Sequence, residues 1–189
     1  MIESTGWGLP DTTFYMHEME EGFEGGCAID GSAGFKWVIK RAQDLFADKK
    51  VVIFGLPGAF TPTCTNSQLP GYDAMAEDFK ALGVDEIWCT SVNDAFVMDK
   101  WKVELGVQNV KMLPDGNGTF AEAMGMLVDK SNLGFGKRSW RYAALIDNLE
   151  VKEMWVEDAW SSDLAATDPY GVSSPENVYT QVKARLTGE

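Results

Sequence analysis

The sequence predicts an α/β protein with a central mixed β-sheet, flanking helices and an N-terminal extension. The first observation is a continuously apolar run at residues 51–56, which is typical of a strand buried on both faces. The second is a stretch of helical periodicity between this run and the next apolar run, as in parallel strands joined by a crossover helix. The third is a pair of late apolar runs on either side of Asn148-Leu149, a pattern that indicates an antiparallel hairpin.

The length of 189 residues suits one domain. We expect it to span residues 1–189, with strands and turns in residues 1–50 and the core in residues 51–189. Hydrophobic residues make up 45% of the chain, which argues against disorder. No apolar run has the length of a membrane helix, and the first residues lack the pattern of a secretory signal. We therefore expect a cytoplasmic protein with no membrane partner.

Charge, cysteine and histidine usage exclude several functions. Sixteen basic residues against 29 acidic ones give a formal net charge of −13, so we expect no nucleic-acid partner. The cysteines, Cys27, Cys64 and Cys89, form no Cys-x-x-Cys pair and suit a reducing compartment. The one histidine, His17, lies in an acid-rich segment, where we expect it to be solvated. This residue set predicts no bound metal, no cofactor and no Ser-His-Asp catalysis.

The strand predicted at residues 51–56 is followed by a loop, Pro57 to Thr63, and then by a helix. The helix is indicated by apolar residues at helical spacing, namely Leu69, Tyr72, Met75, Ala76, Phe79 and Leu82. Pro70 lies inside this helix, so we expect a kink there.

The rest of the chain completes the predicted topology. The further elements are a strand at residues 84–90, a helix near 95–105, an irregular insert at 106–136, strands at 140–147 and 151–157, and a final helix. Asn93 or Asp94 can cap the second helix, and Ser174 followed by Pro175 marks the start of the last one. The order β-α-β-α, insert, β-β-α is the thioredoxin-like arrangement. In such sheets ligands bind at the carboxyl ends of strands, which points to the loop at residues 57–64.

This loop carries a motif. The residues are Pro57-Gly58-Ala59-Phe60-Thr61-Pro62-Thr63-Cys64. Their spacing of a proline, three residues, a threonine or serine, two residues and a cysteine resembles the signature of the peroxiredoxin family. Residues 55–72 and 91–97 are similar to its type-five subfamily. The similarity covers residues 36–157 and implies a thiol peroxidase with a thioredoxin-like fold.

The motif has a chemical basis. Cys64 falls in the first turn of the predicted helix, where free N–H groups and the helix dipole favour a thiolate. Thr61 lies three residues earlier, so its hydroxyl can reach both the sulfur and a bound peroxide oxygen. Pro57 fixes the loop and can shield the sulfur from water. We expect Cys64, Thr61 and Pro57 to belong to the catalytic site.

An arginine completes the expected site by resemblance. Residues 137–143 are similar to the arginine strand of the family, and Arg141 takes the place of its arginine. A fixed guanidinium there would stabilise the thiolate and the developing oxyanion. Arg138 is the alternative, because the two side chains of one strand would point to opposite faces and only one could serve.

The resemblance implies reduction of hydrogen peroxide and organic hydroperoxides through a sulfenic acid on Cys64. Some type-five members place a second, resolving cysteine before the final helix, but residues 158–174 contain none. We therefore expect a one-Cys cycle closed by an external thiol, either glutathione with glutaredoxin or thioredoxin. Cys89 is expected in the core and Cys27 in an inert turn. The resemblance also implies a homodimer.

Two other functions stay open at this point. One is a peroxide sensor that passes oxidation to a partner, and the other is a non-catalytic thioredoxin-like binding or holdase module. Gln68 is a departure, because relatives often carry histidine soon after the catalytic cysteine. We expect this change to affect local polarity or a dimer contact.

Overall fold

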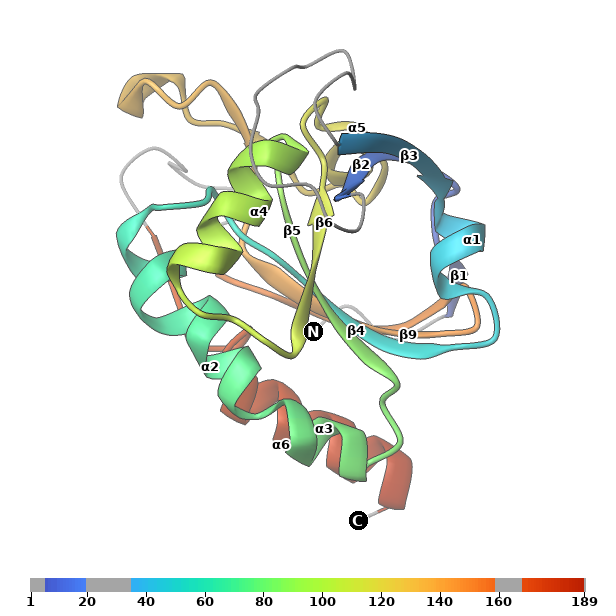
Figure 1. Ribbon diagram of the computed structural model, residues 1–189. Helices are drawn as coiled ribbons and strands as arrows, with labels where there is room; N and C mark the ends of the chain where they lie inside the picture. The colour runs from blue at the N-terminus through green and yellow to red at the C-terminus, as the bar shows by residue number, and fades with distance from the viewer. Residues whose placement is uncertain (1–5, 20–34, 159–167, 189) are drawn as a thin grey trace.

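A six-stranded mixed β-sheet forms the centre of the molecule (Figure 1). The computed structural model describes residues 6–19, 35–158 and 168–188. In sheet order the strands are β1 (Trp7–Gly8), β10 (Glu150–Val156), β9 (Tyr142–Asp147), β4 (Lys50–Gly55), β5 (Glu86–Ser91) and β6 (Val110–Pro114). β4, β5 and β6 run parallel to one another, whereas β9 is antiparallel to β4 and β10 is antiparallel to β9. The predicted mixed sheet is therefore confirmed.

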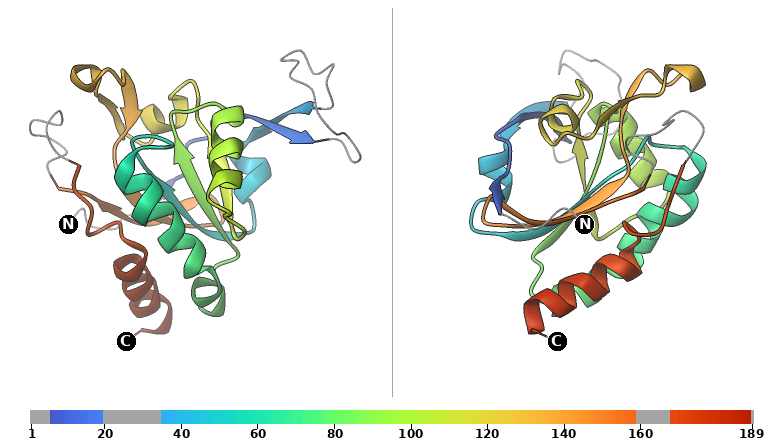
Figure 2. Two further views of the ribbon diagram at one scale, coloured as in Figure 1. Left: turned by 60° about the vertical axis from the view of Figure 1, so that its left-hand side comes forward. Right: turned by 180° about the vertical axis from the view of Figure 1, so that it is seen from behind.

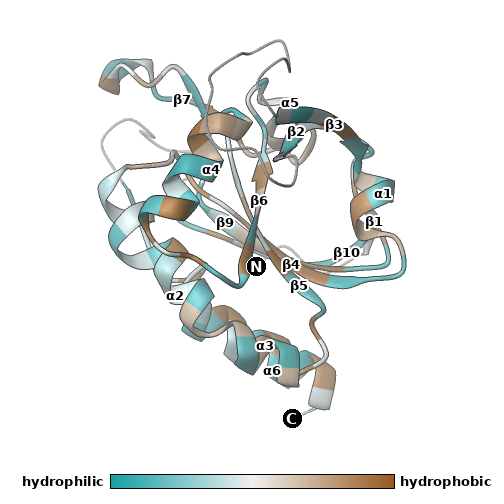
Figure 3. Cartoon of the chain, viewed as in Figure 1, coloured by the Kyte–Doolittle hydropathy of each residue, from teal (hydrophilic) through white to brown (hydrophobic). Residues whose placement is uncertain are grey.

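Strand β4 is buried on both faces. Its residues Val51, Val52, Ile53 and Phe54 have no exposed surface. Because successive side chains of a strand point to opposite faces, Val52 and Phe54 join one apolar cluster and Val51 and Ile53 join the other. Figure 3 shows hydrophobic residues along these central strands. The continuous apolar run therefore predicted this strand correctly.

Two layers cover the sheet (Figure 2). Strands β2 (Thr13–Met19) and β3 (Phe35–Arg41) lie outside the central sheet. The α-helices are α1 (Ala42–Phe46), α2 (Leu69–Ala74), α3 (Ala76–Ala81), α4 (Ala95–Glu104), α5 (Thr119–Ala123) and α6 (Pro175–Thr187). Helices α2, α3, α4 and α6 contribute to one apolar cluster, and β2, α1 and α5 contribute to the other. α6 lies beside α3, where the rings of Phe79 and Tyr179 are 5.7 Å apart. Among the described helices, none is both long and apolar enough to cross a membrane.

The segment at residues 106–136, expected to be irregular, contains regular structure. It holds β6 and α5, the short strand β7 (Leu127–Asp129) and a 3₁₀ turn at Ser131–Leu133, and β7 pairs with β8 (Lys137–Ser139). β6 escaped prediction because it is only five residues long and ends in a proline, which a sheet tolerates at its edge. The strand predicted at 140–147 begins only at Tyr142.

The helix after the loop is interrupted. It begins as a π-helix at Cys64–Gln68, in which Leu69 N–H donates to the Cys64 carbonyl oxygen five residues back. Pro70 lies in the first turn of α2, where a missing N–H does little harm. The break falls at Met75, between α2 and α3, with φ −94° and ψ 6°. The helix also changes from π to α at Leu69, directly before Pro70, and the kink expected at Pro70 stays a prediction.

Two further expectations have different outcomes. The turn at Asn148 and Leu149 has positive φ at both residues, 45° and 65°, as a two-residue hairpin turn requires, so the predicted hairpin is confirmed. The expectation that His17 is solvated was wrong. Its side chain is only 4% exposed, with Nδ1 3.2 Å from Asp99 Oδ2 and the ring 4.6 Å from that of Phe96. Packing of β2 against α4 buries it despite the acid-rich sequence around it.

Candidate active site

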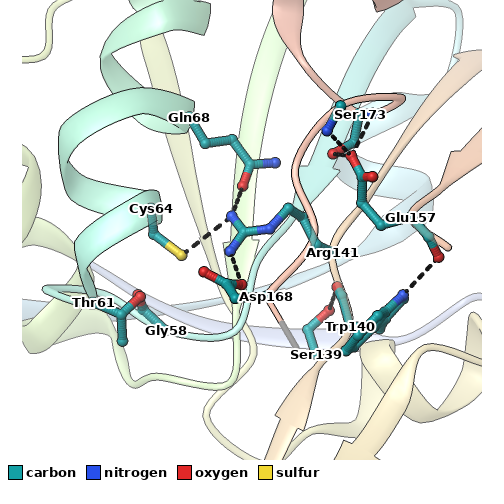
Figure 4. A network of polar contacts seen from close by, with 11 residues as sticks. Gly58, Thr61, Cys64, Gln68, Ser139, Trp140, Arg141, Glu157, Asp168 and Ser173 are labelled. Atoms are coloured by element: carbon teal, nitrogen blue, oxygen red, sulfur yellow. Dashed lines mark hydrogen bonds and ion pairs between the residues drawn. The ribbon is translucent and has the colours of Figure 1, made fainter. Parts of the chain in front are cut away.

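Cys64 lies beyond the carboxyl end of β4, where the topology predicted the site. Pro62 and Thr63 are already helical, so Cys64 belongs to the first turn, as expected. Its side chain is fully buried. The sulfur lies 3.5 Å from Nη1 of Arg141, which directly precedes β9, the strand paired with β4 (Figure 4). A thiol and a guanidinium are therefore in direct contact inside the protein.

The loop before Cys64 is held by short hydrogen bonds. The Thr61 hydroxyl donates to the Gly58 carbonyl oxygen at 2.8 Å, which leaves the lone pairs of its own oxygen available. Ala59 N–H donates to Asn93 Oδ1 at 3.0 Å, so Asn93 braces the loop. Asp94 rather than Asn93 caps α4, accepting from Val97 N–H at 3.0 Å. Pro57 is buried at the start of the loop.

Arg141 is a buried cation with several partners. It lies between β8 and β9 and is only 1% exposed. Besides the sulfur, Nη1 donates to Gln68 Oε1 and Nη2 donates to the Asp168 carboxylate. Burial acts to lower the pKa of Arg141, but the charges and hydrogen bonds of Cys64 and Asp168 outweigh it and raise that pKa. The guanidinium therefore stays charged.

Arg138 has a different environment. It lies on β8, with Nε donating to Phe135 O at 3.0 Å and Nη1 donating to Val92 O at 3.2 Å. Arg141 is therefore the arginine that contacts Cys64. The strand alternation used to separate the two was the wrong reason, because Arg138 and Arg141 do not share a strand.

Sequence reasoning missed the residues that surround Arg141. Gln68 is fully buried and accepts from the guanidinium, whereas the expectation was an effect on local polarity or on a dimer contact. Asp168 comes from the segment before α6 and carries no local signal of this contact. The ring of Tyr170 lies 5.6 Å from the Arg141 Cζ. Burial raises the pKa of Tyr170 to about 12, so its phenol is neutral at physiological pH.

Of the other two cysteines, the structure describes Cys89 but not Cys27. Cys89 is fully buried in β5, as expected, and packs in the same apolar cluster as Cys64. Burial raises the pKa of the Cys89 thiol well above its ordinary value. Cys27 lies outside the described residues.

A thioredoxin-like sheet with a buried thiol against a charged guanidinium, at the carboxyl end of a parallel strand, defines a thiol-based redox protein. The family model described as Redoxin matches residues 40–167. A peroxiredoxin of Rhizobium etli is 52% identical over 176 residues, covering 93% of this chain and 94% of the relative. The chain belongs to the peroxiredoxin family and acts as a thiol-dependent peroxidase.

Two more comparisons refine this assignment. The hybrid peroxiredoxin hyPrx5 of Haemophilus influenzae is 49% identical over 145 residues, which cover 77% of this chain and 58% of that protein. This agrees with the expected type-five subfamily. The crystal structure of reduced Prx3 from Vibrio vulnificus in complex with H₂O₂ has a TM-score of 0.78 at 37% identity and covers 98% of both chains. The thioredoxin-like fold is confirmed.

Proposed function

We propose that Cys64 is the residue that reduces hydrogen peroxide and organic hydroperoxides. The Cys64 thiolate attacks one peroxide oxygen, so that an S–O bond forms while the O–O bond breaks. The leaving oxygen takes a proton and departs as water or an alcohol, and Cys64 becomes a sulfenic acid. The observation that carries this proposal is the contact between the buried Cys64 sulfur and Nη1 of Arg141.

Ionisation of the thiol is a small part of the acceleration. For thiols in general, lowering the pKa from about 8.5 to about 6 raises the thiolate fraction at pH 7 roughly 30-fold. Because nucleophilicity falls roughly 13-fold with a Brønsted slope of about 0.45, the net gain is only about two- to three-fold. Enzymes achieve roughly 10⁶-fold or more. Most of the effect must come from aligning the O–O bond and stabilising the leaving oxygen.

We assign that alignment to Thr61, Arg141 and Pro57. The Thr61 hydroxyl donates to the Gly58 carbonyl oxygen and keeps its lone pairs, so it can accept a hydrogen bond from the O–H group of the peroxide. The charged Arg141 faces the sulfur and can stabilise negative charge on the leaving oxygen. Pro57 is buried at the start of the loop, and we assign to it the role of limiting access of water to the sulfur.

We propose that an external thiol closes the cycle. The thiol attacks the Cys64 sulfenic acid to give a mixed disulfide and water, and a second thiol then releases Cys64 as it forms a disulfide with the first. The reductant is glutathione with glutaredoxin, or thioredoxin. The absence of cysteine from residues 158–174 supports this one-Cys cycle, as does the burial of Cys89.

The remaining features of the proposal rest on the resemblance and on composition. We place residues 1–189 in one domain that forms a homodimer through the edge near the active site. Phe60, four residues before Cys64, is 51% exposed at that edge, which suits a contact between subunits. The sparse cysteine content favours the cytoplasm.

Steady-state peroxide consumption tests the proposal. We expect turnover by the wild-type protein with glutathione plus glutaredoxin or with thioredoxin, and loss of more than nine-tenths of it in Cys64→Ser. Circular dichroism should show the same fold in both proteins. Cys89→Ser is the matched control and should keep its turnover. Full oxidation of Cys64 without turnover by either reductant would favour the sensor, and no reaction with peroxide would favour the binding module.

A further inference from the structure

The segment from Asp168 to Ser173 contacts Arg141, and the Asp168 carboxylate lies against its guanidinium on the same side as Cys64 in the view of Figure 4. The Asp168 carboxylate accepts from Nη2, and the Tyr170 ring lies 5.6 Å from Cζ. The Asp168 side chain is 49% exposed, whereas that of Arg141 is 1% exposed. A half-exposed carboxylate is therefore paired with a buried cation.

This segment is fixed at its far end. Glu157, only 4% exposed, accepts through Oε1 from the N–H groups of Gly171 and Ser173 at 2.7 and 2.8 Å. The Ser173 hydroxyl donates to the same oxygen at 2.7 Å, and the Tyr72 hydroxyl donates to the Ser173 carbonyl oxygen at 2.8 Å. Glu157 N–H also donates to the Arg141 carbonyl oxygen at 3.1 Å. One buried residue thus ties the segment to the backbone of Arg141.

The two terminal nitrogens of the Arg141 guanidinium have different partners. Nη2 is held by Asp168, and Nη1 is left facing Cys64 and Gln68. A buried arginine needs an opposite charge nearby, and a planar guanidinium held at one edge can turn little at the other. Among the described residues, Asp168 supplies the carboxylate that pairs with Arg141.

We propose that Asp168 is a positioning residue, which aims Nη1 of Arg141 at the reacting atoms of Cys64. This inference rests on the proposed roles of Cys64 and Arg141. Without Asp168 the guanidinium keeps its charge but loses its orientation. The step that needs a directed donor, cleavage of the O–O bond, then slows, whereas attack of Cys64 on a reagent that needs no such donor does not.

The test compares two reactions of Cys64 in Asp168→Ala and Asp168→Asn. Stopped-flow tryptophan fluorescence gives the rate constant for oxidation by hydrogen peroxide, and loss of free thiol gives the rate constant for alkylation by iodoacetamide. We expect Asp168→Ala to slow oxidation about tenfold or more while alkylation stays within about threefold. Asp168→Asn, which keeps an acceptor, should lie between it and wild type. A merely structural defect would expose the buried thiol and accelerate alkylation.

Two controls separate the alternatives. Glu176→Gln removes an exposed carboxylate from the start of α6 and should leave both rates unchanged. In the background of Arg141→Ala, loss of Asp168 should cause no further slowing, because Asp168 acts through the arginine. Losses that multiply, or wild-type or faster oxidation in Asp168→Ala, overturn the inference. If Arg141→Ala itself leaves oxidation unchanged, the proposed function fails as well.

Discussion

Arg141 shows how one side chain links a buried thiol to the rest of the protein. A guanidinium removed from water is tolerated only when its charge and its donors are matched by partners. Cys64 and Gln68 of the π-helix and Asp168 of the segment before α6 provide acceptors for its two Nη atoms, whereas Nε has no hydrogen-bond partner among the described residues. The side chain is therefore held in one orientation, which a surface arginine would not be.

We predict that Arg141→Ala slows oxidation of Cys64 by about 10² to 10³, because a directed donor to the leaving oxygen is lost. Stopped-flow oxidation by hydrogen peroxide measures this rate constant. Arg138→Ala is the matched control and should cost less than threefold, since its guanidinium donates to Phe135 and Val92. Equal losses in the two variants would show that contact with the sulfur is not what matters.

Gln68 changes the character of the site relative to a histidine. Its amide Oε1 accepts from Arg141, and an amide does not titrate. A histidine in its place would change charge between about pH 5 and 8. Gln68 is therefore a neutral partner of Arg141 at every physiological pH, so no change of charge at this position alters the interactions of the guanidinium with Cys64 and Asp168.

At the scale of elements, the π-helix Cys64–Gln68 and the strand order bring the site together. Both ends of this one-turn element, Cys64 and Gln68, contact the same arginine. The arginine precedes β9, which pairs directly with β4, the strand that leads into the Cys64 loop. Because β4 and β9 are neighbours in the sheet, the thiol that follows β4 and the guanidinium that precedes β9 lie at the same end of these two strands.

Strand β5 is joined to its neighbours by a charged contact at its start. Glu86 accepts from Lys49 at 3.2 Å, from Lys111 of β6 and from Trp88 Nε1 at 2.9 Å. Burial acts to raise the pKa of Glu86, but the hydrogen bonds from Lys111, Lys49 and Trp88 lower it overall. A lowered pKa in the folded state means that the ionised carboxylate contributes stability.

We predict that Glu86→Gln lowers the free energy of unfolding at pH 7 by at most about 1 kcal/mol, because the ion pair is partly screened by solvent. The difference from wild type should be complete above the unfolded pKa of about 4.3 and shrink as the pH falls through the lower folded value. Urea denaturation across pH 3 to 7 measures it. Glu77→Gln, at an exposed position of α3, should give a difference near zero at each pH. A difference that grows on acidification would contradict the assignment.

At the scale of the whole molecule, the site is assembled from residues far apart in the chain and closed by the segment before α6. Glu157 follows β10, Asp168 precedes α6 and Tyr72 lies on α2, yet all act on Arg141 or on the segment over it. The second described cysteine, Cys89, is locked into the central sheet. Cys64 therefore contacts the Arg141 cation, but no second accessible thiol is available to it among the described residues.

We predict that stoichiometric peroxide yields no Cys64–Cys89 disulfide. Burial raises the pKa of Cys89, which keeps it a thiol, and the thiolate is the form that attacks a sulfenic acid. Non-reducing peptide mapping should instead find Cys64 as a sulfenic acid, or as a mixed disulfide when glutathione is present. A quantitative crosslink of Cys64 to Cys89 or to Cys27 would refute the one-Cys cycle, and Cys89→Ser tells these two crosslinks apart.

The sequence by itself determined the features that depend on local pattern. The apolar run of β4, the hairpin at Asn148 and the position of Cys64 in a first helical turn all follow from neighbours within a few residues. Resemblance located Arg141. Only the tertiary structure decided which side chains meet Arg141, that His17 is buried, and that residues 110–114 form an edge strand. These depend on packing between elements distant in the chain, because a contact such as that of Asp168 leaves no periodic or local trace in the sequence.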